Sequence, residues 1–365
     1  MTYPPAASGV LTIDLAALVA NWRYLQDRAR PAEAAAVVKA NGYGLGLELV
    51  AKALADAGCK MFFVAHPSEG ALARKTVGPE PRIFVLNGLQ VTADPKRDYA
   101  DFDLAPAIGS EAELARWKAF DATAPFALHL DTGMNRLGFA SLEDMLRSLS
   151  RHGGEGAELL MTHFVSAEEP DNPLNAAQIA RFAAARAALP ALPAGIANSS
   201  GVFLQGASCD WIRPGYALYG GNPTPGAENP MRAVATLDVV IQQIRWIEAG
   251  ESCGYNSQWT AQRRTRLATL LAGYADGLPR GAGATDARAG ADVLIRGKFC
   301  PLVGRVSMDL TIADVTDIPE AQVGDFARFF GPDAPLDDFA ARSVTIGYNV
   351  LTSLGSRYAR LVVGL

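Results

Sequence analysis

Short apolar runs alternate with helical patterns about eight times between residues 34 and 215, and this repeat constrains the fold most strongly. Such runs are typical of strands buried on both faces, and parallel strands of this kind are joined by helical crossovers. About eight units predict an α/β fold, an eight-stranded parallel β/α barrel of the TIM type. The runs are Ala34–Val38, Met61–Ala65, Ile83–Leu86, Leu104–Ile108, Phe126–Leu130, Leu159–Met161, Gly195–Ala197 and Trp211–Ile212.

Helical patterns fill most of the intervals between these runs. They are Leu47–Ala57, Ser110–Phe120, Ser141–Arg151 and Pro173–Ala188. Ser110 and Ser141 each precede acidic residues, as helix N-cap residues often do. Upstream of the first run, Ile13–Ala29 has apolar residues at helical spacing, which predicts an amphipathic helix.

A different pattern begins at about residue 230, where β-like runs follow one another between Gly, Pro and Asp turns. The runs are Val234–Glu248, Thr265–Leu271, Val293–Ile295, Pro301–Val306, Leu310–Val315 and Asp325–Phe330. We therefore expect a barrel domain at 1–230, which includes the N-terminal helix and a linker at about 220–230, and a mostly β domain at 231–365. Residues 281–292, rich in Gly and Ala, are predicted to form a mobile loop.

The composition argues against several classes of function. A net charge of -5 and a pI near 5.5 argue against a nucleic-acid partner. No apolar run approaches the roughly 20 residues that span a bilayer. Because the N-terminus lacks the pattern of a signal peptide, we expect a cytoplasmic protein with no membrane partner. The four cysteines and four histidines lack metal-ligand spacing, so no metal site is expected.

The segment Ala35–Gly44 carries the strongest chemical signal in the chain. Its apolar strand stops at Lys39, and a turn with Gly42 and Tyr43 follows. A lysine at the end of a buried strand is partly desolvated, which should lower its pKa. A partly neutral amine can attack an aldehyde, so Lys39 is a candidate Schiff-base lysine. Alone, it would fit an ordinary surface lysine better.

Polar residues follow five of the predicted strands, at the point where each strand ends. They are Lys39, the segment Asp131–Arg136, His163, the pair Asn198–Ser199 and the segment Arg213–Gly215. The carboxyl ends of barrel strands meet at one mouth, where active sites lie, so these residues should converge. Any one of them could have only a local structural role.

A phosphate site is expected beside Lys39, because the last two strands of such barrels often form one. Ser199, the backbone around Gly215 and the Tyr43 hydroxyl are suitable neutral donors. A Schiff-base lysine next to a phosphate site points to pyridoxal 5'-phosphate. Without Lys39, turn chemistry would explain Ser199 and Gly215 better.

Seven motifs, in order along nearly the whole chain, resemble the alanine racemase family. They are Val38–Gly44, Leu130–Gly138, Thr162–Phe164, Ala197–Ser199, Arg213–Gly215, Gly273–Gly277 and Val303–Asp309. The resemblance implies a pyridoxal-phosphate barrel followed by a β domain, which agrees with the expectation from the residues. It also implies a head-to-tail homodimer, which the residues alone do not indicate.

The resemblance further implies two acid–base residues, because racemisation removes a proton from one face of the Cα and returns it to the other. One is Lys39, which also holds the cofactor. The other is Tyr255, reaching in from the partner subunit. A phenol is a weak base at neutral pH and needs cationic or donor neighbours. His163 is similar to the family histidine that bonds this tyrosine. Without the resemblance, Tyr255 would fit an exposed aromatic residue in a β loop.

Arg213 is similar to the family arginine that is linked to this histidine and faces the pyridine nitrogen of the cofactor. A guanidinium stays protonated, so the ring nitrogen should stay unprotonated and the ring should accept electrons less well. Fewer side reactions then compete with proton exchange. In isolation, Arg213 would fit a surface arginine before a turn.

Arg136 is similar to the arginine that contacts both the cofactor's phenolic oxygen and the substrate carboxylate. Met308 of the partner subunit would donate its backbone N–H to that carboxylate. The cofactor-binding set implied by the resemblance is Lys39, Tyr43, Arg136, Asn198, Ser199, Arg213, Gly215, Tyr216 and Tyr348. The expected entrance residues are Tyr274, Arg280, Arg305 and Tyr348, and the first three fit ordinary surface positions equally well.

The chain departs from the family pattern at His129, where many relatives have a lysine that becomes carbamylated and holds the arginine. A neutral imidazole supplies no negative charge, so either a bound anion such as chloride substitutes or Arg136 is held less firmly. Leu45 replaces a frequent histidine and should alter packing or the edge of the pocket. The 281–292 loop is also longer than usual.

The expected function is therefore racemisation of L- and D-alanine, which supplies D-alanine for peptidoglycan or consumes it. A serine or broad-specificity racemase of the same fold is the nearest alternative. A pyridoxal-phosphate decarboxylase is disfavoured, since it would not need Tyr255 and would favour a carboxylate over Arg213 at the ring nitrogen. A non-catalytic carrier of the cofactor, usually a lone barrel, is disfavoured by the second domain.

Overall fold

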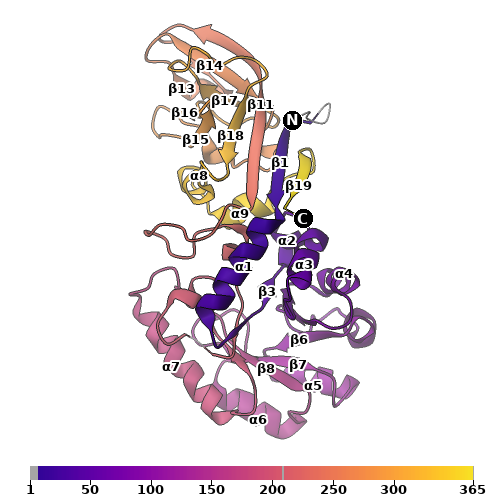
Figure 1. The fold of residues 1–365 in the computed structure, drawn as a ribbon. Coiled ribbons are helices and arrows are strands. Elements are labelled where there is room, and N and C mark those ends of the chain that lie inside the picture. The colour runs from indigo at the N-terminus through magenta and orange to yellow at the C-terminus, as the bar shows by residue number, and fades with distance from the viewer. Residues whose placement is uncertain (1–6, 208, 365) are drawn as a thin grey trace. The chain divides into compact units, whose positions relative to one another are not determined.

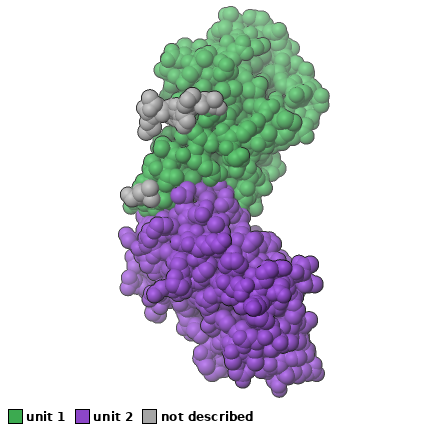
Figure 2. All heavy atoms as spheres, turned by 90° about the vertical axis from the view of Figure 1, so that its right-hand side faces the viewer, with its two compact units in different colours: residues 1–17, 219–221, 232–365 green, residues 18–218, 222–231 purple. Residues whose placement is uncertain are grey.

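The computed structural model describes residues 7–207 and 209–364, which belong to two compact units (Figures 1 and 2). The barrel unit consists of residues 18–218 and 222–231, and the β unit of residues 1–17, 219–221 and 232–365. The described residues up to 17 thus group with the C-terminal part of the chain. A domain boundary at residue 230 stays a prediction.

Parallel strands of the barrel unit close into a ring. The strands are β2 (Glu33–Ala34), β3 (Ala36–Val37), β4 (Met61–Val64), β5 (Arg82–Val85), β6 (Leu104–Ile108), β7 (Phe126–His129), β8 (Ala157–Met161), β9 (Ala194–Gly195) and β10 (Trp211–Ile212). β3 to β9 form one sheet in chain order, while β10 pairs with β2. Only Ala35 separates β2 from β3, and its N–H donates to the Ile212 oxygen at 2.9 Å. On the other side the Arg213 N–H donates to the Ala197 oxygen at 2.8 Å. The expected eight-stranded parallel barrel is confirmed.

Helices cross over between these strands much as the apolar spacing predicts. They are α3 (Leu47–Asp56), α4 (Pro67–Val77), α5 (Glu111–Phe120), α6 (Leu142–His152) and α7 (Pro173–Ala188). The hydroxyl of Ser110 accepts from the Glu113 N–H at 3.3 Å, and that of Ser141 from the Asp144 N–H at 3.0 Å. Both predicted N-caps are therefore confirmed, whereas α4 was not predicted.

The prediction of a helix from Ile13 was wrong at its start. Residues Gly9–Asp14 form strand β1, and α1 (Leu15–Ala29) begins after them. β1 lies between two partners, β11 (Ala235–Ile247) and β19 (Ala359–Val363), so its apolar residues pack in a sheet. The Asp14 carboxylate accepts from the Ala17 N–H at 2.9 Å and caps the helix. A helical spacing continued by chance into the strand, and tertiary pairing decided the outcome.

The β unit is organised around the long strand β11, which pairs with β1, β14 and β18. Its remaining strands are β12 (Ser252–Cys253), β13 (Trp259–Thr260), β14 (Thr265–Leu270), β15 (Asp292–Ile295), β16 (Lys298–Pro301), β17 (Thr311–Asp314) and β18 (Phe326–Phe330). Two short helices, α8 (Leu336–Arg342) and α9 (Gly347–Thr352), follow them. The expected mostly β C-terminal region is confirmed.

The strand predicted at Pro301–Val306 lies closer to the N-terminus in the structure, as β16 (Lys298–Pro301). The hairpin β15–β16 turns through Arg296 and Gly297, whose φ values of 49° and 77° fit a tight two-residue connection, so its second strand ends at Pro301. Beyond it, Gly304 has φ of 69°, which interrupts an extended strand. Isolated bridges replace regular pairing there.

Residues 281–292, which we expected to be mobile, are tied down by Arg288. Its guanidinium donates to the carbonyl oxygens of Gly283 at 3.0 Å and Arg342 at 2.9 Å, and also to that of Gly281. Backbone bonds add to this, including Ala284 N–H to the Leu302 oxygen at 2.8 Å. The small side chains of this segment therefore allow close packing around one arginine.

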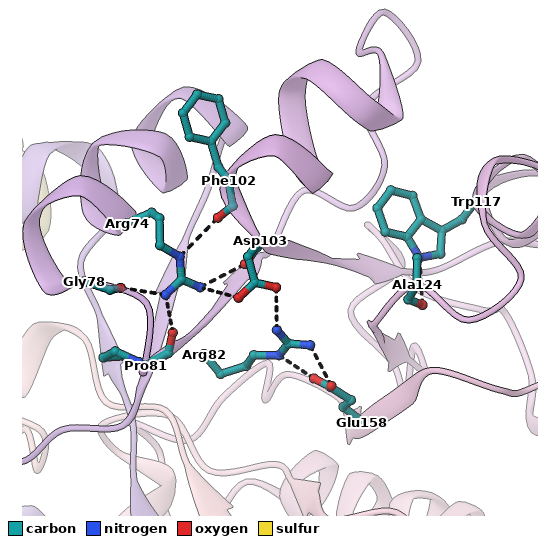
Figure 3. Close-up of polar contacts among 9 residues, drawn as sticks. All are labelled: Arg74, Gly78, Pro81, Arg82, Phe102, Asp103, Trp117, Ala124 and Glu158. Atoms are coloured by element: carbon teal, nitrogen blue, oxygen red, sulfur yellow. Dashed lines mark hydrogen bonds and ion pairs between the residues drawn. The ribbon is translucent and has the colours of Figure 1, made fainter.

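An ion-pair network links the amino ends of three barrel strands (Figure 3). Arg82, at the start of β5, donates to Glu158 on β8 at 2.5 and 2.6 Å and to Asp103 before β6 at 2.9 Å. Arg74 on α4 donates to the same Asp103 at 3.1 Å. Polar groups on this face of a barrel serve stability, because the chemistry lies at the opposite mouth.

Replacement of Arg82 by Met should lower the free energy of unfolding by about 1–2 kcal/mol, because it removes a bidentate, partly buried pair with Glu158 and the contact with Asp103. Urea titration followed by far-ultraviolet circular dichroism measures this loss. Arg97→Met, which removes an ion pair of a far more exposed arginine, is the matched control. Equal stability of the two variants would show that the network contributes nothing.

Candidate active site

A left-handed turn, α2 (Lys39–Tyr43), follows the first barrel strand. Ala40, Asn41 and Tyr43 have φ values of 54°, 54° and 53°. This conformation costs a non-glycine residue roughly 1–2 kcal/mol, so other contacts must stabilise it. The Asn41 side-chain oxygen accepts from the Leu47 N–H at 3.0 Å and ties the turn to the start of α3. The lysine therefore projects from a constrained backbone.

Glu69 holds this turn, although sequence analysis did not identify it. One oxygen of its carboxylate accepts from the Ala40 N–H at 2.6 Å, and the other from the N–H groups of Ala65 and His66 at 2.8 and 3.2 Å. One side chain thus joins the left-handed turn to the start of α4. The available signal was Pro67 followed by an acid two residues later, which marks a helix N-terminus.

The amine of Lys39 is shifted towards its neutral form. Burial lowers the pKa of Lys39 below its ordinary value of 10.5, and the charge of Arg136 lowers it further, while Glu69 opposes both. The lowered pKa expected from the sequence is confirmed. A lysine in this state is a better nucleophile towards a carbonyl carbon.

Hydrogen-bond donors gather around Ser199, after the last two barrel strands. Its hydroxyl oxygen accepts from the N–H groups of Gly215 and Ala217, each at 3.1 Å. A Cβ at position 215 would collide with the Tyr43 hydroxyl, so this position requires glycine. Burial raises the pKa of Tyr43, and its phenol stays a neutral donor. Neutral hydroxyls and backbone N–H groups in one place suit a phosphate. These residues fit the phosphate of the expected cofactor.

Asn198 and Tyr216 flank this cradle. The Asn198 side-chain oxygen accepts from the Gly201 N–H at 2.8 Å and shapes the turn after β9. Tyr216 is buried at the start of a short 3-10 turn, Tyr216–Tyr219. Their direct contact with a cofactor stays a prediction.

Arg213 is buried in the barrel mouth, with 4% of its surface exposed. It donates to the Gly195 oxygen at 2.6 Å and to the Thr162 oxygen, and its guanidinium carbon lies 5.7 Å from the centre of the Phe63 ring. Burial lowers the pKa of Arg213 to about 10, so it stays protonated at neutral pH. Among the described residues no carboxylate forms an ion pair with it. Its charge is therefore available to a ligand.

Two histidines lie beside these cations and are neutral at pH 7. Burial, followed by the charges of Arg213, Lys39 and Arg136, lowers the pKa of His163 to about 3. Burial and the charge of Arg213 lower the pKa of His129 to about 4. Lys39, Arg136, His163 and Arg213 follow the parallel strands β3, β7, β8 and β10, whose carboxyl ends meet at one mouth of the barrel.

The departure at His129 leaves a buried polar atom without a partner. Within residues 7–207 and 209–364, nothing accepts from or donates to its Nδ1. A neutral ring next to Arg136 provides no countercharge. The nearby charge that opposes the effects of Arg213 and Arg136 on this ring is the Asp131 carboxylate.

Arg136 is positioned through its backbone instead. Asp131 accepts from the N–H groups of Gly133, Met134 and Arg136 at 2.7, 2.8 and 3.2 Å, which fixes the loop. The Arg136 residue itself is exposed. A cavity of about 800 Å³ lies beside it. Polar residues that line this cavity are Asp131, Thr132, Asn135, Arg136, Ser141 and Arg181.

Gln178 on α7 is a second residue that sequence analysis missed. Its amide donates to the Thr132 hydroxyl at 2.9 Å and to the His163 oxygen at 3.0 Å, and the Thr132 and Thr162 hydroxyls lie 2.8 Å apart. It therefore links the Arg136 loop to the histidine. No short motif surrounds it, so only the fold reveals its role.

The other predicted site residues belong to the β unit and are described within it alone. Tyr255, in the turn Tyr255–Ser257 between β12 and β13, is 65% exposed, and Met308 is 52% exposed. Tyr348 lies in α9. The expected entrance residues Tyr274, Arg280 and Arg305 lie in or beside turns of the same unit.

In the part of the chain that the structure describes, no group of three or more His, Cys, Asp or Glu side chains could hold a metal ion. Among the same residues no helix is long and apolar enough to cross a membrane.

Comparison with known proteins agrees with this geometry. The family model described as "Alanine racemase, N-terminal domain" matches residues 13–223, and "Alanine racemase, C-terminal domain" matches residues 234–362. The alanine racemase of Methylobacterium nodulans is 48% identical over 99% of this chain and 97% of its own length. That of Acidiphilium cryptum is 49% identical over 96% and 98%. The crystal structure of alanine racemase from Bartonella henselae with covalently bound pyridoxal phosphate is 35% identical, with a TM-score of 0.90 over 98% of this chain and 100% of that one.

The neutral state of His129 should make folding stability depend on pH. The unfolded chain binds a proton on this histidine as the pH falls through about 6.5, whereas the folded chain does so only near 4. Stability from this group is therefore present above pH 6.5 and is lost towards pH 4. When the pH falls from 7 to 5, protonation of His129 in the unfolded chain should lower the free energy of unfolding of the parent protein by up to about 2 kcal/mol. His129→Gln should lack this part of the decrease.

Urea titrations of both proteins at pH 5, 6, 7 and 8 measure this difference. The two curves should run parallel between pH 7 and 8, which serves as the internal control. Parallel curves over the whole range would mean that folding does not change the proton affinity of His129.

Proposed function

The chain belongs to the alanine racemase family, and we propose that it interconverts L- and D-alanine with pyridoxal 5'-phosphate bound in the barrel mouth. The family assignment rests on matches that cover nearly the whole chain. The observation that carries the mechanism is the juxtaposition of Lys39 and Arg213 with the Ser199–Gly215 cradle at the closing strand of the barrel. A cytoplasmic location and a role in D-alanine supply for peptidoglycan belong to the same proposal.

The cofactor would be held at both of its ends by residues of this chain. Lys39 would bind its carbonyl carbon, and the hydroxyls of Tyr43 and Ser199 would bind its phosphate, with the Ser199 oxygen held by the Gly215 N–H. When bound, pyridoxal phosphate supplies an electrophilic carbonyl for amino groups and a ring that accepts electron density as the Cα–H bond breaks. Asn198, Tyr216 and Tyr348 complete the proposed set.

Arg213 would limit the reaction to proton exchange. Because it is buried and protonated at neutral pH, it would offer a donor, and no proton, to the pyridine nitrogen. A ring that accepts electrons less well stabilises negative charge on the Cα less, so fewer side reactions compete with proton exchange. Decarboxylases of this barrel type favour a carboxylate at that place, so Arg213 counts against that alternative.

Lys39 and Tyr255 of the partner subunit would be the two acid–base residues. Inversion at the Cα requires one group on each face, because the proton leaves one side and returns on the other. We assign Tyr255 to the face from which L-alanine loses its proton. Protonated Arg213 and neutral His163 would provide the cationic and hydrogen-bonding surroundings that a phenolate needs.

A homodimer with shared active sites would bring Tyr255 to this mouth. The exposed fractions of Tyr255 and Met308, 65% and 52%, are large for an aromatic and a methionine side chain. Burial against a second copy would account for both. Met308 of the partner subunit would then donate its backbone N–H to the substrate carboxylate.

Substrate orientation would rest on Arg136. Its loop is fixed by Asp131, and its guanidinium has no hydrogen-bonded or ion-paired partner among the described residues. It is therefore available to a carboxylate. A serine or broad-specificity racemase would use the same residues, and the size of the pocket around Cβ of the substrate separates the two alternatives.

Circular dichroism tests the reaction and the substrate together. Purified protein with pyridoxal phosphate should abolish the optical activity of L-alanine and leave L-serine and L-lysine unchanged. Lys39→Ala should lose both this activity and the visible absorbance of the bound cofactor. Decay with serine or lysine would support the broad-specificity alternative, and no decay with any substrate would reject racemase function.

Tyr255→Phe tests the two-base assignment. Removal of one acid–base group should lower racemisation about 10²–10⁴-fold, with the cofactor still bound. Lys39 should still exchange the α-proton of D-alanine with D₂O without inversion, which proton NMR detects. Tyr24→Phe, an exposed tyrosine on α1, is the control. Full activity of Tyr255→Phe would remove this residue as a base.

A further inference from the structure

The turn that carries Tyr255 has little support of its own. It connects β12 and β13, which form a separate two-stranded sheet with only two residue pairs, Ser252 with Thr260 and Cys253 with Trp259. Isolated hairpins of this size are marginally stable in water. Asn256, next to the tyrosine, adds a φ of 62°. The position of the phenol must therefore depend on contacts from outside the hairpin.

One side of the hairpin packs against the backbone around Gly304. A Cβ on Gly254 would lie 3.0 Å from the Arg305 nitrogen, and a Cβ on Gly304 would lie 2.9 Å from the Cys253 oxygen. Both positions have φ in the left-handed region, 79° and 69°. The backbone segments around Gly254 and Gly304 thus approach as closely as glycine permits. This contact prevents the hairpin from moving towards Gly304.

The other side is held by Asp286. Its carboxylate accepts from the Thr260 N–H at 2.8 Å and from the Thr260 hydroxyl at 3.0 Å, and its own N–H donates to the Gln258 oxygen at 2.8 Å. Three hydrogen bonds therefore fix the strand that leaves the tyrosine turn. Asp286 belongs to the 281–292 segment, which Arg288 anchors to carbonyl oxygens of the β unit.

We propose that Asp286 is a positioning residue for Tyr255, and that the 281–292 segment is a brace that holds the second acid–base group in place. This inference rests on the proposed function, because it matters only if Tyr255 exchanges a proton with the substrate. Asp286 makes no contact with substrate or cofactor in this scheme. It acts by fixing the backbone three and five residues beyond the tyrosine, at Gln258 and Thr260.

The brace should affect one proton transfer and leave the other unchanged. Lys39 is held by Glu69 in the barrel unit, so loss of the Asp286 bonds displaces only the tyrosine face. Misplacement by about 1 Å can slow a step by up to about 100-fold. The equilibrium constant between enantiomers is one, so kcat/KM must fall equally in both directions. Isotope effects, however, report each face separately.

The test uses the holoenzyme and alanine deuterated at Cα. Asp286→Ala should lower kcat about tenfold, raise the isotope effect on L-alanine and reduce that on D-alanine, while cofactor affinity stays within twofold. Asp286→Asn keeps an acceptor for the Thr260 N–H and a donor for its hydroxyl, so it should restore most of the activity. Asp317→Ala, an exposed aspartate paired with Arg263, is the matched control.

Hydrogen–deuterium exchange of the peptide that spans residues 254–260 gives a readout besides activity. Exchange in this peptide should rise in Asp286→Ala and stay at the parent level in both Asp286→Asn and Asp317→Ala. The inference would be overturned if the parent protein is active but Asp286→Ala shows unchanged isotope effects or unchanged exchange at 254–260. A parent that does not racemise alanine would instead overturn the proposed function, which separates the two failures.

Discussion

Closure of the barrel is the constraint on which the site depends. The last strand must hydrogen-bond to the first, and the Val37 N–H donates to the Pro214 oxygen at 3.0 Å. This pairing brings residues almost 180 positions apart in sequence to adjacent places. Gly215 then lies against the Tyr43 hydroxyl, and the charges of Arg213 and Lys39 both act on His163. The nucleophile and the phosphate cradle are therefore neighbours because the ring closes, and a different strand order would separate them.

Strand ends predicted which polar residues meet at the barrel mouth, because parallel strands put their carboxyl ends at one mouth. Lys39, His163, Ser199 and Arg213 were proposed in this way, and their roles in binding and chemistry stay predictions. What the sequence did not reveal depends on contacts between distant segments. Glu69 lies in a helix that we missed, and its bond to the Ala40 N–H has no local signature. The last two residues of β1, Ile13 and Asp14, were assigned to the predicted helix because its apolar spacing extends back to Ile13. Only pairing with β11 and β19 places them in a strand.

Charge distribution explains why the departure at His129 is tolerable within the fold. The mouth concentrates positive charge on Lys39, Arg136 and Arg213, and burial together with these charges keeps both nearby histidines neutral. A protonated imidazole would add a further cation to a desolvated site. Neutral His129 avoids that cost, and within residues 7–207 and 209–364 no carboxylate forms an ion pair with Arg136. Asp131 fixes the Arg136 loop through backbone N–H groups, and the proposed substrate carboxylate would complete the orientation of the guanidinium.

The two proposed acid–base groups have contrasting structural support, and this contrast has a physical reason. Lys39 projects from a strained left-handed turn, which the closed barrel and Glu69 hold rigid. Such strain persists only where the surroundings over-determine the backbone. Tyr255, by contrast, is 65% exposed, and in the proposed dimer it would be offered to a second copy of the chain. An exposed side chain gains little from its own packing, and precision has to come from the backbone. Close glycine contacts at Gly254 and Gly304 and the hydrogen bonds of Asp286 supply it from both sides of the hairpin. A residue that completes the active site of a partner subunit thus needs a brace for its backbone. A residue inside a barrel is held by its surroundings and needs none.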